Sequence, residues 1–216
     1  DTPLGSYSIR EWRKRCGVVM QDGFIFSDSI AGNIAPGVEH IDKKRLRHAA
    51  EVANIHDFIE ELPLAYNTKI GQEGHGLSQG QKQRILIARA VYKDPEFIFF
   101  DEATNALDAN NERTIMNNLQ TFFKGRTSVV VAHRLSTVRN AEQIIVIEQG
   151  RIAETGTHEA LIALEGRYYK LVMKTIYFLQ RQRTTRTDFH LGTALFQIEV
   201  RPGRAGKYGA VIRLQR

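Results

Sequence analysis

The chain has 216 residues, 42% of them hydrophobic, so it is long enough to bury a sizeable core. Its net charge is +6, but residues 1–174 carry 22 basic and 22 acidic side chains, so the whole excess lies in residues 175–216. This distribution excludes a basic, nucleic-acid-binding surface formed by residues 1–174. The single cysteine, Cys16, excludes an internal disulfide and indicates a reducing compartment. The sequence has no run of about 18 apolar residues, so it predicts no membrane-spanning helix.

The first part of the chain predicts a short strand followed by a helical region. Residues 18–19 belong to the strand, beside which we expect Cys16 to pack, and bulky apolar residues follow Gln21 at positions 24–26. Residues 41–62 predict a helical segment that ends before a proline. Its apolar face is formed by Leu46, Ala49, Ala50, Ala53 and Ile55.

Residues 81–92 carry regularly spaced apolar side chains without glycine or proline, which predicts a helix. Ser78 and Gln81, three residues apart, have the form of a capping box at its start. The free N–H groups and the positive dipole end of such a helix can bind an anion, and phosphate is the ligand expected near Ser78 and Gly80. On its own, a helix start of this kind is more often only a capped helix.

A continuous apolar run at residues 97–100 predicts a strand buried on both faces of a parallel sheet. Asp101 follows at its carboxyl end, where ligands bind in open α/β sheets and a carboxylate suits Mg²⁺. Glu102 can orient or deprotonate an attacking water. The alternative is that the two acidic side chains only make the end of the strand soluble and have no role in catalysis.

Two more core strands are predicted at residues 127–132 and 144–147, and a helix at about residues 110–123 precedes them. His133 follows the first of these strands, so we expect it at the same sheet edge as Glu102. A neutral imidazole there can contact a terminal phosphate and the attacking water. The alternative is a hydrogen-bonded histidine at the rim of the sheet.

The order of these motifs resembles the nucleotide-binding domain of ABC transporters, over roughly residues 5–172. Any one motif is weak, but five in the family's order are specific. They are Gln21, residues 77–81, residues 97–102, residues 106–108 and residues 132–134. The resemblance implies an α/β fold, a partial P-loop NTPase (RecA-like) core with a parallel sheet and a small α-helical signature subdomain.

The resemblance also implies a role for each residue in the first two motifs. Gln21 corresponds to the glutamine loop, which contacts Mg²⁺ and water and links the site to the membrane part. Ser78, Gly80 and Gln81 correspond to the signature motif, which closes over ATP held by the opposite subunit. Gln79 stands where glycine is commonest, a variant similar to that of peptide exporters, which implies an exporter of peptides or bacteriocins.

The remaining motifs imply the catalytic parts of the site. Asp101 corresponds to the Walker B carboxylate that binds Mg²⁺, and Glu102 to the catalytic base. Asp108 corresponds to the aspartate that crosses to the other subunit near ATP, and His133 to the switch histidine.

The sequence contains no Gly-x4-Gly-Lys-Ser/Thr pattern, which is the phosphate-binding Walker A loop. Residues 71–76 have the glycine spacing, but Leu77 stands at the position of the lysine, and residues 203–208 contain Gly-Lys at the wrong spacing. In the family this loop precedes the glutamine loop. We therefore expect an N-terminally truncated piece that binds ATP poorly and does not hydrolyse it alone.

Four regions are expected along the chain. Residues 1–21 end the N-terminal part of the core, residues 22–90 form the helical subdomain with the signature motif, residues 91–174 hold Walker B and the switch histidine, and residues 175–216 are a basic tail of unknown role. The tail can form a hairpin from residues 196–200 and 208–214. It is either a basic element that touches acidic lipid or nucleic acid, or a solvated extension.

The resemblance implies ATP and Mg²⁺ as cofactors, and as partners a second copy in a head-to-tail dimer and the transmembrane domain of a transporter. It also implies that this domain lies on the cytoplasmic side of the plasma (inner) membrane. We expect that partner to contact Phe24, Phe26 and Glu73, although the two phenylalanines suit the subdomain core equally well. No nucleic-acid partner is expected, because the interval between Gln21 and Ser78 lacks a coiled-coil heptad run. Two alternatives stay open: a soluble ABC ATPase of nucleic-acid metabolism, and a non-catalytic fragment.

Overall fold

The computed structural model describes residues 3–72, 74–101, 103, 106–131, 139–184, 195–196 and 210–214. The chain forms two compact units, Asp1–Arg126 and Thr127–Arg216, and each is described by itself. Within the described residues no helix combines the length and the apolar character that crossing a membrane requires.

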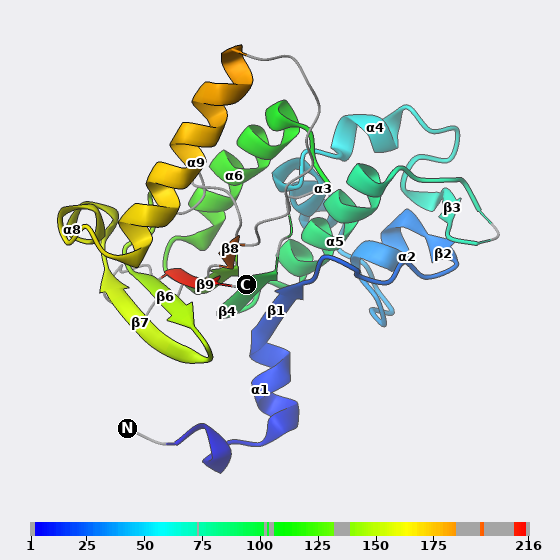
Figure 1. Cartoon of the computed structure of the whole chain (residues 1–216). Coiled ribbons are helices and arrows are strands. Elements are labelled where there is room, and N and C mark those ends of the chain that lie inside the picture. The colour runs from blue at the N-terminus through cyan, green and yellow to red at the C-terminus, as the bar shows by residue number, and fades with distance from the viewer. Residues whose placement is uncertain are drawn as a thin grey trace. The chain divides into compact units, whose positions relative to one another are not determined.

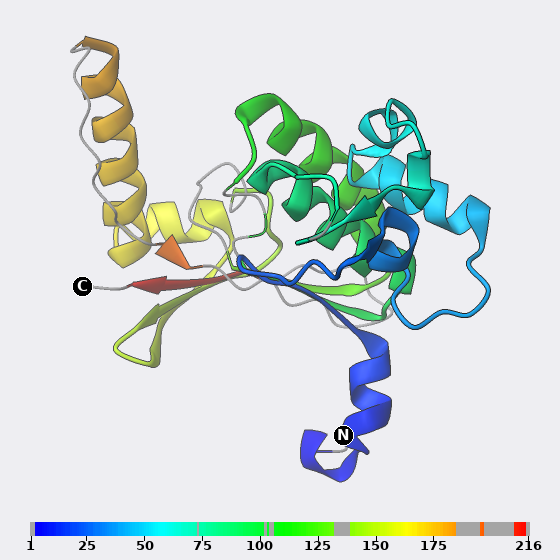
Figure 2. The same ribbon diagram turned by 90° about the vertical axis from the view of Figure 1, so that its right-hand side faces the viewer.

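The first unit contains a short parallel sheet and a group of helices (Figure 1). Its elements are η1 (Leu4–Ser6), α1 (Ile9–Arg15), β1 (Cys16–Val19), β2 (Asp28–Ser29), α2 (Ile30–Ile34), α3 (Lys43–Val52), α4 (His56–Glu60), η2 (Ala65–Asn67), β3 (Lys69–Ile70), α5 (Gln79–Lys93), β4 (Phe97–Asp101) and α6 (Ala109–Phe123). Figure 2 shows β1 continuing directly from α1.

Helix α5 is the central helix of the first unit, and it packs against α2, α3 and β1 (Figure 1). Its apolar side chains are buried, with Ile85 and Ile87 fully enclosed. The helix ends because Asp94 adopts a left-handed conformation, with φ of 53°, and a proline follows. The structure thus confirms the helix predicted at residues 81–92 and extends it by two residues at its start and one at its end.

The helical segment predicted at residues 41–62 forms two helices, α3 and α4. All five residues of the predicted apolar face are buried. Between the helices Asn54 has a φ of 52°, a conformation that asparagine tolerates better than most residues, and the chain changes direction there.

Strand β4 confirms the strand predicted at residues 97–100, but the expectation of burial on both faces is wrong. Ile98 and Phe100 are buried, whereas Phe97 and Phe99 are only half-buried. The reason is that helices cover one face: Phe100 packs edge-on against Phe123 of α6, with ring centroids 5.4 Å apart. On the other face Trp12 of α1 lies 4.6 Å from the ring of Phe97.

The second unit contains the predicted strands and a C-terminal helical part. Its elements are β5 (Thr127–Val131), β6 (Ile144–Glu148), β7 (Arg151–Gly156), α8 (His158–Ala163), α9 (Arg167–Thr184), β8 (Leu195–Phe196) and β9 (Ala210–Leu214). Strands β6 and β7 form an antiparallel hairpin, visible in Figure 2. Strand β9 pairs antiparallel with β8, as the predicted tail hairpin requires, and also pairs parallel with β6, which the sequence did not predict.

The core of the second unit gathers around Tyr168 of α9, which is 1% exposed. Its hydroxyl lies 2.7 Å from Nδ1 of His158, at the start of α8. Burial raises the pKa of Tyr168 to about 12. The folded chain therefore favours the neutral phenol more strongly than the unfolded chain does.

The raised pKa of Tyr168 predicts a loss of stability at alkaline pH. Because the unfolded phenol ionises near its ordinary pKa of 10.0 and the folded one at about 12, the stabilisation is complete below pH 10 and is lost between those values. The free energy of unfolding, measured with urea across this pH range, should fall less steeply for Tyr168→Phe than for the wild type. The variant should lose about 1 kcal/mol at neutral pH, from the hydrogen bond to His158. Tyr169→Phe is the matched control, and parallel curves for the wild type and Tyr168→Phe would contradict the prediction.

Candidate functional site

The start of α5 is an exposed, fully formed capping box, as predicted. The backbone N–H of Gln81 donates to Oγ of Ser78 at 3.2 Å, and the backbone N–H of Ser78 donates to Oε1 of Gln81 at 2.7 Å. Ser78 and Gln79 are exposed. The positive end of the helix therefore faces solvent and is accessible to an anion.

Gly80, in the first turn of α5, lies against the backbone just before α6. A Cβ atom at this position would be 3.2 Å from the carbonyl oxygen of Ala106, closer than most such contacts allow. Leu107, the next residue, is buried. Glycine thus lets two predicted motifs, the signature loop and residues 106–108, approach each other closely.

Asp108 is the N-cap of α6. Its Oδ1 accepts hydrogen bonds from the backbone N–H groups of Asn110 and Asn111, and its Oδ2 accepts one from Nδ2 of Asn111 at 2.5 Å. The side-chain hydrogen bond from Asn111, followed by the backbone ones, holds the pKa of Asp108 below its ordinary value. The carboxylate stays exposed, so it combines a structural role with access to a ligand.

Three residues that the sequence did not single out link α5 to this cap. Nη1 of Arg84 donates to the carbonyl oxygen of Asn54 at 2.6 Å, and Nδ2 of Asn54 donates to Oδ1 of Asn111 at 2.8 Å. Burial lowers the pKa of Arg84, and the nearby Asp108 partly offsets this. An arginine inside an apolar helix is the one sequence signal that can reveal such a link, because its guanidinium needs acceptors.

Asp101 and Gln21 both lie at the same edge of the parallel sheet. Strands β1 and β4 are parallel, and their last registered pair is Val19 with Phe100. Asp101 ends β4, and Gln21 lies two residues beyond Val19, so both follow the carboxyl ends of neighbouring strands. Glu102 and His133 lie outside the described residues, as does Glu73.

Within the described ranges, no group of three or more His, Cys, Asp or Glu side chains gathers to hold a metal. Asp101 is half-buried and Gln21 is exposed. Both supply oxygen atoms, the ligands that Mg²⁺ prefers, and Mg²⁺ usually keeps several waters. The donor set at this edge therefore suits a Mg²⁺ ion that a nucleotide helps to hold.

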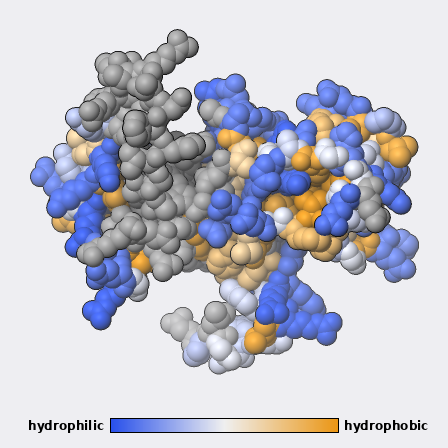
Figure 3. Space-filling view, turned by 45° about the vertical axis from the view of Figure 1, so that its right-hand side comes forward, coloured by the Kyte–Doolittle hydropathy of each residue, from blue (hydrophilic) through white to orange (hydrophobic). Residues whose placement is uncertain are grey.

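Phe24 and Phe26 lie at the surface rather than in the core. Phe24 is 69% exposed and Phe26 is 43% exposed, and their rings meet edge to face with centroids 5.2 Å apart. Figure 3 shows exposed apolar patches among the polar residues of the surface. The sequence left two possibilities for this pair, a partner contact and a place in the subdomain core, and these exposed fractions do not fit the core.

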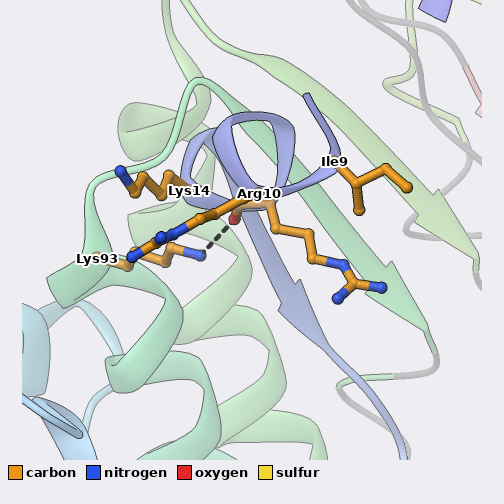
Figure 4. Close-up of a pocket in the computed structure, with 5 residues that line it drawn as sticks. Ile9, Arg10, Lys14 and Lys93 are labelled. Atoms are coloured by element: carbon orange, nitrogen blue, oxygen red, sulfur yellow. Dashed lines mark hydrogen bonds between the residues drawn. The ribbon is translucent and has the colours of Figure 1, made fainter. Parts of the chain in front are cut away.

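A basic cleft beside α1 was not predicted. It is lined by Ile9, Arg10, Arg13, Lys14 and Lys93 (Figure 4). Nζ of Lys93 donates to the carbonyl oxygens of Arg13 at 2.8 Å and Cys16 at 2.7 Å, so it ties the end of α5 to the junction of α1 and β1. Cys16 is buried in β1 as expected, and burial raises its pKa.

The lowered pKa of Asp108 predicts an acid-dependent stability difference. A carboxylate with a depressed pKa stabilises the fold above its ordinary value of 3.8, and the contribution is lost as the pH falls through the folded value. Asparagine can also cap a helix, so Asp108→Asn mainly removes the charge. The difference in melting temperature between the wild type and this variant should be full near pH 7 and should close as the pH falls below 3.8 and through the lowered folded pKa of Asp108.

Asp57→Asn, in the first turn of α4, is the matched control for Asp108→Asn. A gap between the wild type and Asp108→Asn that stayed constant down to the acid limit would show that the carboxylate charge does not stabilise α6.

Comparisons with known proteins assign this geometry to a family. Residues 1–105 match the ABC transporter family. An ATP-dependent lipid A-core flippase from Saccharophagus degradans is 47% identical over 170 residues, which cover 79% of this chain and 29% of the relative. ATP-binding cassette sub-family B member 5 from Mus musculus is 40% identical over 197 residues, covering 91% of this chain and 16% of the relative.

A solved structure of a bacterial Atm1-family ABC exporter with ATP bound is similar, with a TM-score of 0.76 and 38% identity, covering 80% of this chain and 30% of that chain. The chain thus spans less than a third of the length of these relatives. The motifs, the fold and the comparisons agree, and the chain belongs to the ABC transporter family as a nucleotide-binding domain of the exporter type.

Proposed function

We propose that this domain binds ATP with Mg²⁺ at an interface with a second copy of itself, and that ATP binding and hydrolysis there drive export across a membrane. The observation that carries the proposal is the exposed capping box at Ser78, which lies beside residues 106–108 through Gly80. An anion-binding helix start that faces solvent is suited to ATP held by another subunit.

Each subunit contributes two sets of residues to this arrangement. Ser78, Gly80 and Gln81, with Asp108 nearby, contact the nucleotide held by the partner. Oε1 of Gln81 accepts the Ser78 N–H, and the amide N–H groups of the same side chain are the donors that it can offer to phosphate oxygens. The close packing of Gly80 against Ala106 supports a fit to ATP, because a larger residue would push the first turn away from its position.

The catalytic set lies at the end of the parallel strands. Asp101 and Gln21 hold Mg²⁺, which neutralises charge on the phosphate oxygens. Glu102 orients and deprotonates the attacking water, and His133 contacts the terminal phosphate. Support comes from the register of β1 and β4, which brings the ends of these strands to one edge.

The exposed pair Phe24 and Phe26, together with Glu73, is the proposed contact with a transmembrane part, and the domain works on the cytoplasmic side of the plasma membrane. Two adjacent exposed aromatic rings are unusual on a solvated surface and are typical of docking sites. The cargo stays a prediction. Gln79 favours peptides, whereas the name of the Saccharophagus degradans relative refers to lipid A core.

The isolated 216-residue chain is a separate case. Because its sequence contains no Walker A pattern, we propose that it binds ATP weakly and does not turn it over. This favours a non-catalytic fragment over a soluble ATPase of nucleic-acid metabolism as the description of the isolated chain.

Replacement of Glu102 by glutamine tests the catalytic assignment. In the intact exporter, turnover should fall by about 10²–10⁴-fold, the usual contribution of a positioned general base, while ATP binding persists and the dimer stays closed. Steady-state ATPase assays and size-exclusion chromatography with ATP measure the two effects. Glu60→Gln, at the end of α4, is the control and should retain wild-type turnover.

Two outcomes would contradict the proposal. One is a Glu102→Gln exporter that keeps its turnover or remains monomeric with ATP. The other is hydrolysis by the isolated chain at a rate that Glu102→Gln abolishes.

A further inference from the structure

One face of α5 lies along the segment that contains Gln21. Gln83 is 2% exposed, and its Nε2 donates to the carbonyl oxygen of Met20 at 3.4 Å. Leu86, three residues on, packs so tightly on Gly23 that a Cβ there would lie 2.3 Å from its Cδ1. Arg89, three residues further, reaches the two phenylalanines. This spacing of three residues defines a single stripe on the helix.

Arg89 holds the phenylalanine pair through every part of its guanidinium. Nη1 donates to the carbonyl oxygen of Phe24 at 2.9 Å, Nε to the carbonyl oxygen of Asn33 at 2.7 Å, and Nη2 to Oδ1 of Asn33 at 3.2 Å. The charged group also lies over the ring of Phe26, 5.1 Å from its centroid. A planar fork with five N–H donors can satisfy all these acceptors at once, and a lysine cannot.

Asn33 completes the arrangement from α2. Its side chain is fully buried, and its Oδ1 accepts the backbone N–H of Phe26 at 2.8 Å. Its Nδ2 donates to the carbonyl oxygens of Phe26 and Ser29, both at 3.0 Å. The amide thereby fixes the backbone turn that presents the exposed rings.

We propose that Arg89 and Asn33 are positioning residues that lock the Phe24–Phe26 pair to α5, so that the signature loop and the docking surface move as one body. The inference rests on the proposed function, because it assigns the pair to a transmembrane partner and Ser78 to ATP. Arg89 lies eleven residues after Ser78, or about 16 Å along a rigid helix. A shift of the helix start on ATP contact is then transmitted directly to the pair.

Hydrogen exchange of the full chain, followed by NMR, tests the lock without nucleotide or membrane partner. Arg89→Lys and Arg89→Met should both raise the exchange rate of the Phe26 amide by about tenfold or more, since each loses charged hydrogen bonds to this segment. Amides within α3 should stay within about twofold of the wild type, because the effect is local. Arg47→Lys, which keeps an exposed pair with Glu51, is the control.

A distance measurement tests the transmission. Spin labels on Gln79→Cys and Phe24→Cys, in a Cys16→Ala background, should give one narrow distance distribution, and adding Arg89→Lys should broaden it.

The proposal fails if Arg89→Lys keeps wild-type exchange at Phe26, if exchange rises equally throughout α3, or if the distance distribution does not broaden. None of these readouts depends on ATP or on a transporter, so they separate failure of the lock from failure of the proposed function.

Discussion

The structure of the first unit depends on the way helix α5 combines an exposed start with a buried body. The capping box at Ser78 satisfies the backbone N–H groups of Ser78 and Gln81, and the first turn stays exposed to solvent. Its body must be enclosed, and Ile85 and Ile87 are fully buried. The same helix therefore presents an anion site at one end and anchors the fold along the rest of its length.

Three cations on α5 then tie separate parts of the chain to it through neutral acceptors. Arg84 donates to the carbonyl of Asn54, and Lys93 donates to the carbonyls of Arg13 and Cys16. Arg89 binds the segment from Phe24 to Asn33. Burial lowers the pKa of both arginines. Such contacts are directional, so they fix the position of each segment as well as holding it.

The sequence predicted the elements of the fold well, because periodicity and capping are local properties. The helix start at Ser78, the strand that ends at Asp101 and the buried face of α3 and α4 all follow from residues within a few positions of each other. It did not predict the one-sided cover of β4, because which helices lie over a strand depends on distant parts of the chain. The pairing of β9 with β6 was missed for the same reason.

The candidate site was predictable as a set of positions but not as a network. Family motifs pointed to Ser78, Gly80, Asp101 and Asp108. The structure adds the hydrogen bonds, packing and strand register that position these residues. Arg84 and Asn33 donate to backbone carbonyl groups, and Asn54 donates to the side chain of Asn111. Apart from the arginine within the helix, no pattern of residue types points to these contacts. The exposed state of Phe24 and Phe26 likewise depends on packing around them, so the sequence left both possibilities open.

The central claim is that Ser78 acts on ATP held by the opposite subunit, and complementation in the intact exporter tests it most directly. Ser78→Arg and Glu102→Gln are combined in two ways, either both in one subunit or one in each subunit of a mixed dimer. If Ser78 acts across the interface, the split arrangement damages one site and leaves the other whole, so about half of the steady-state ATP turnover survives, whereas the arrangement in one subunit damages both sites. The reverse result, with turnover retained only when both changes lie in one subunit, would contradict the account.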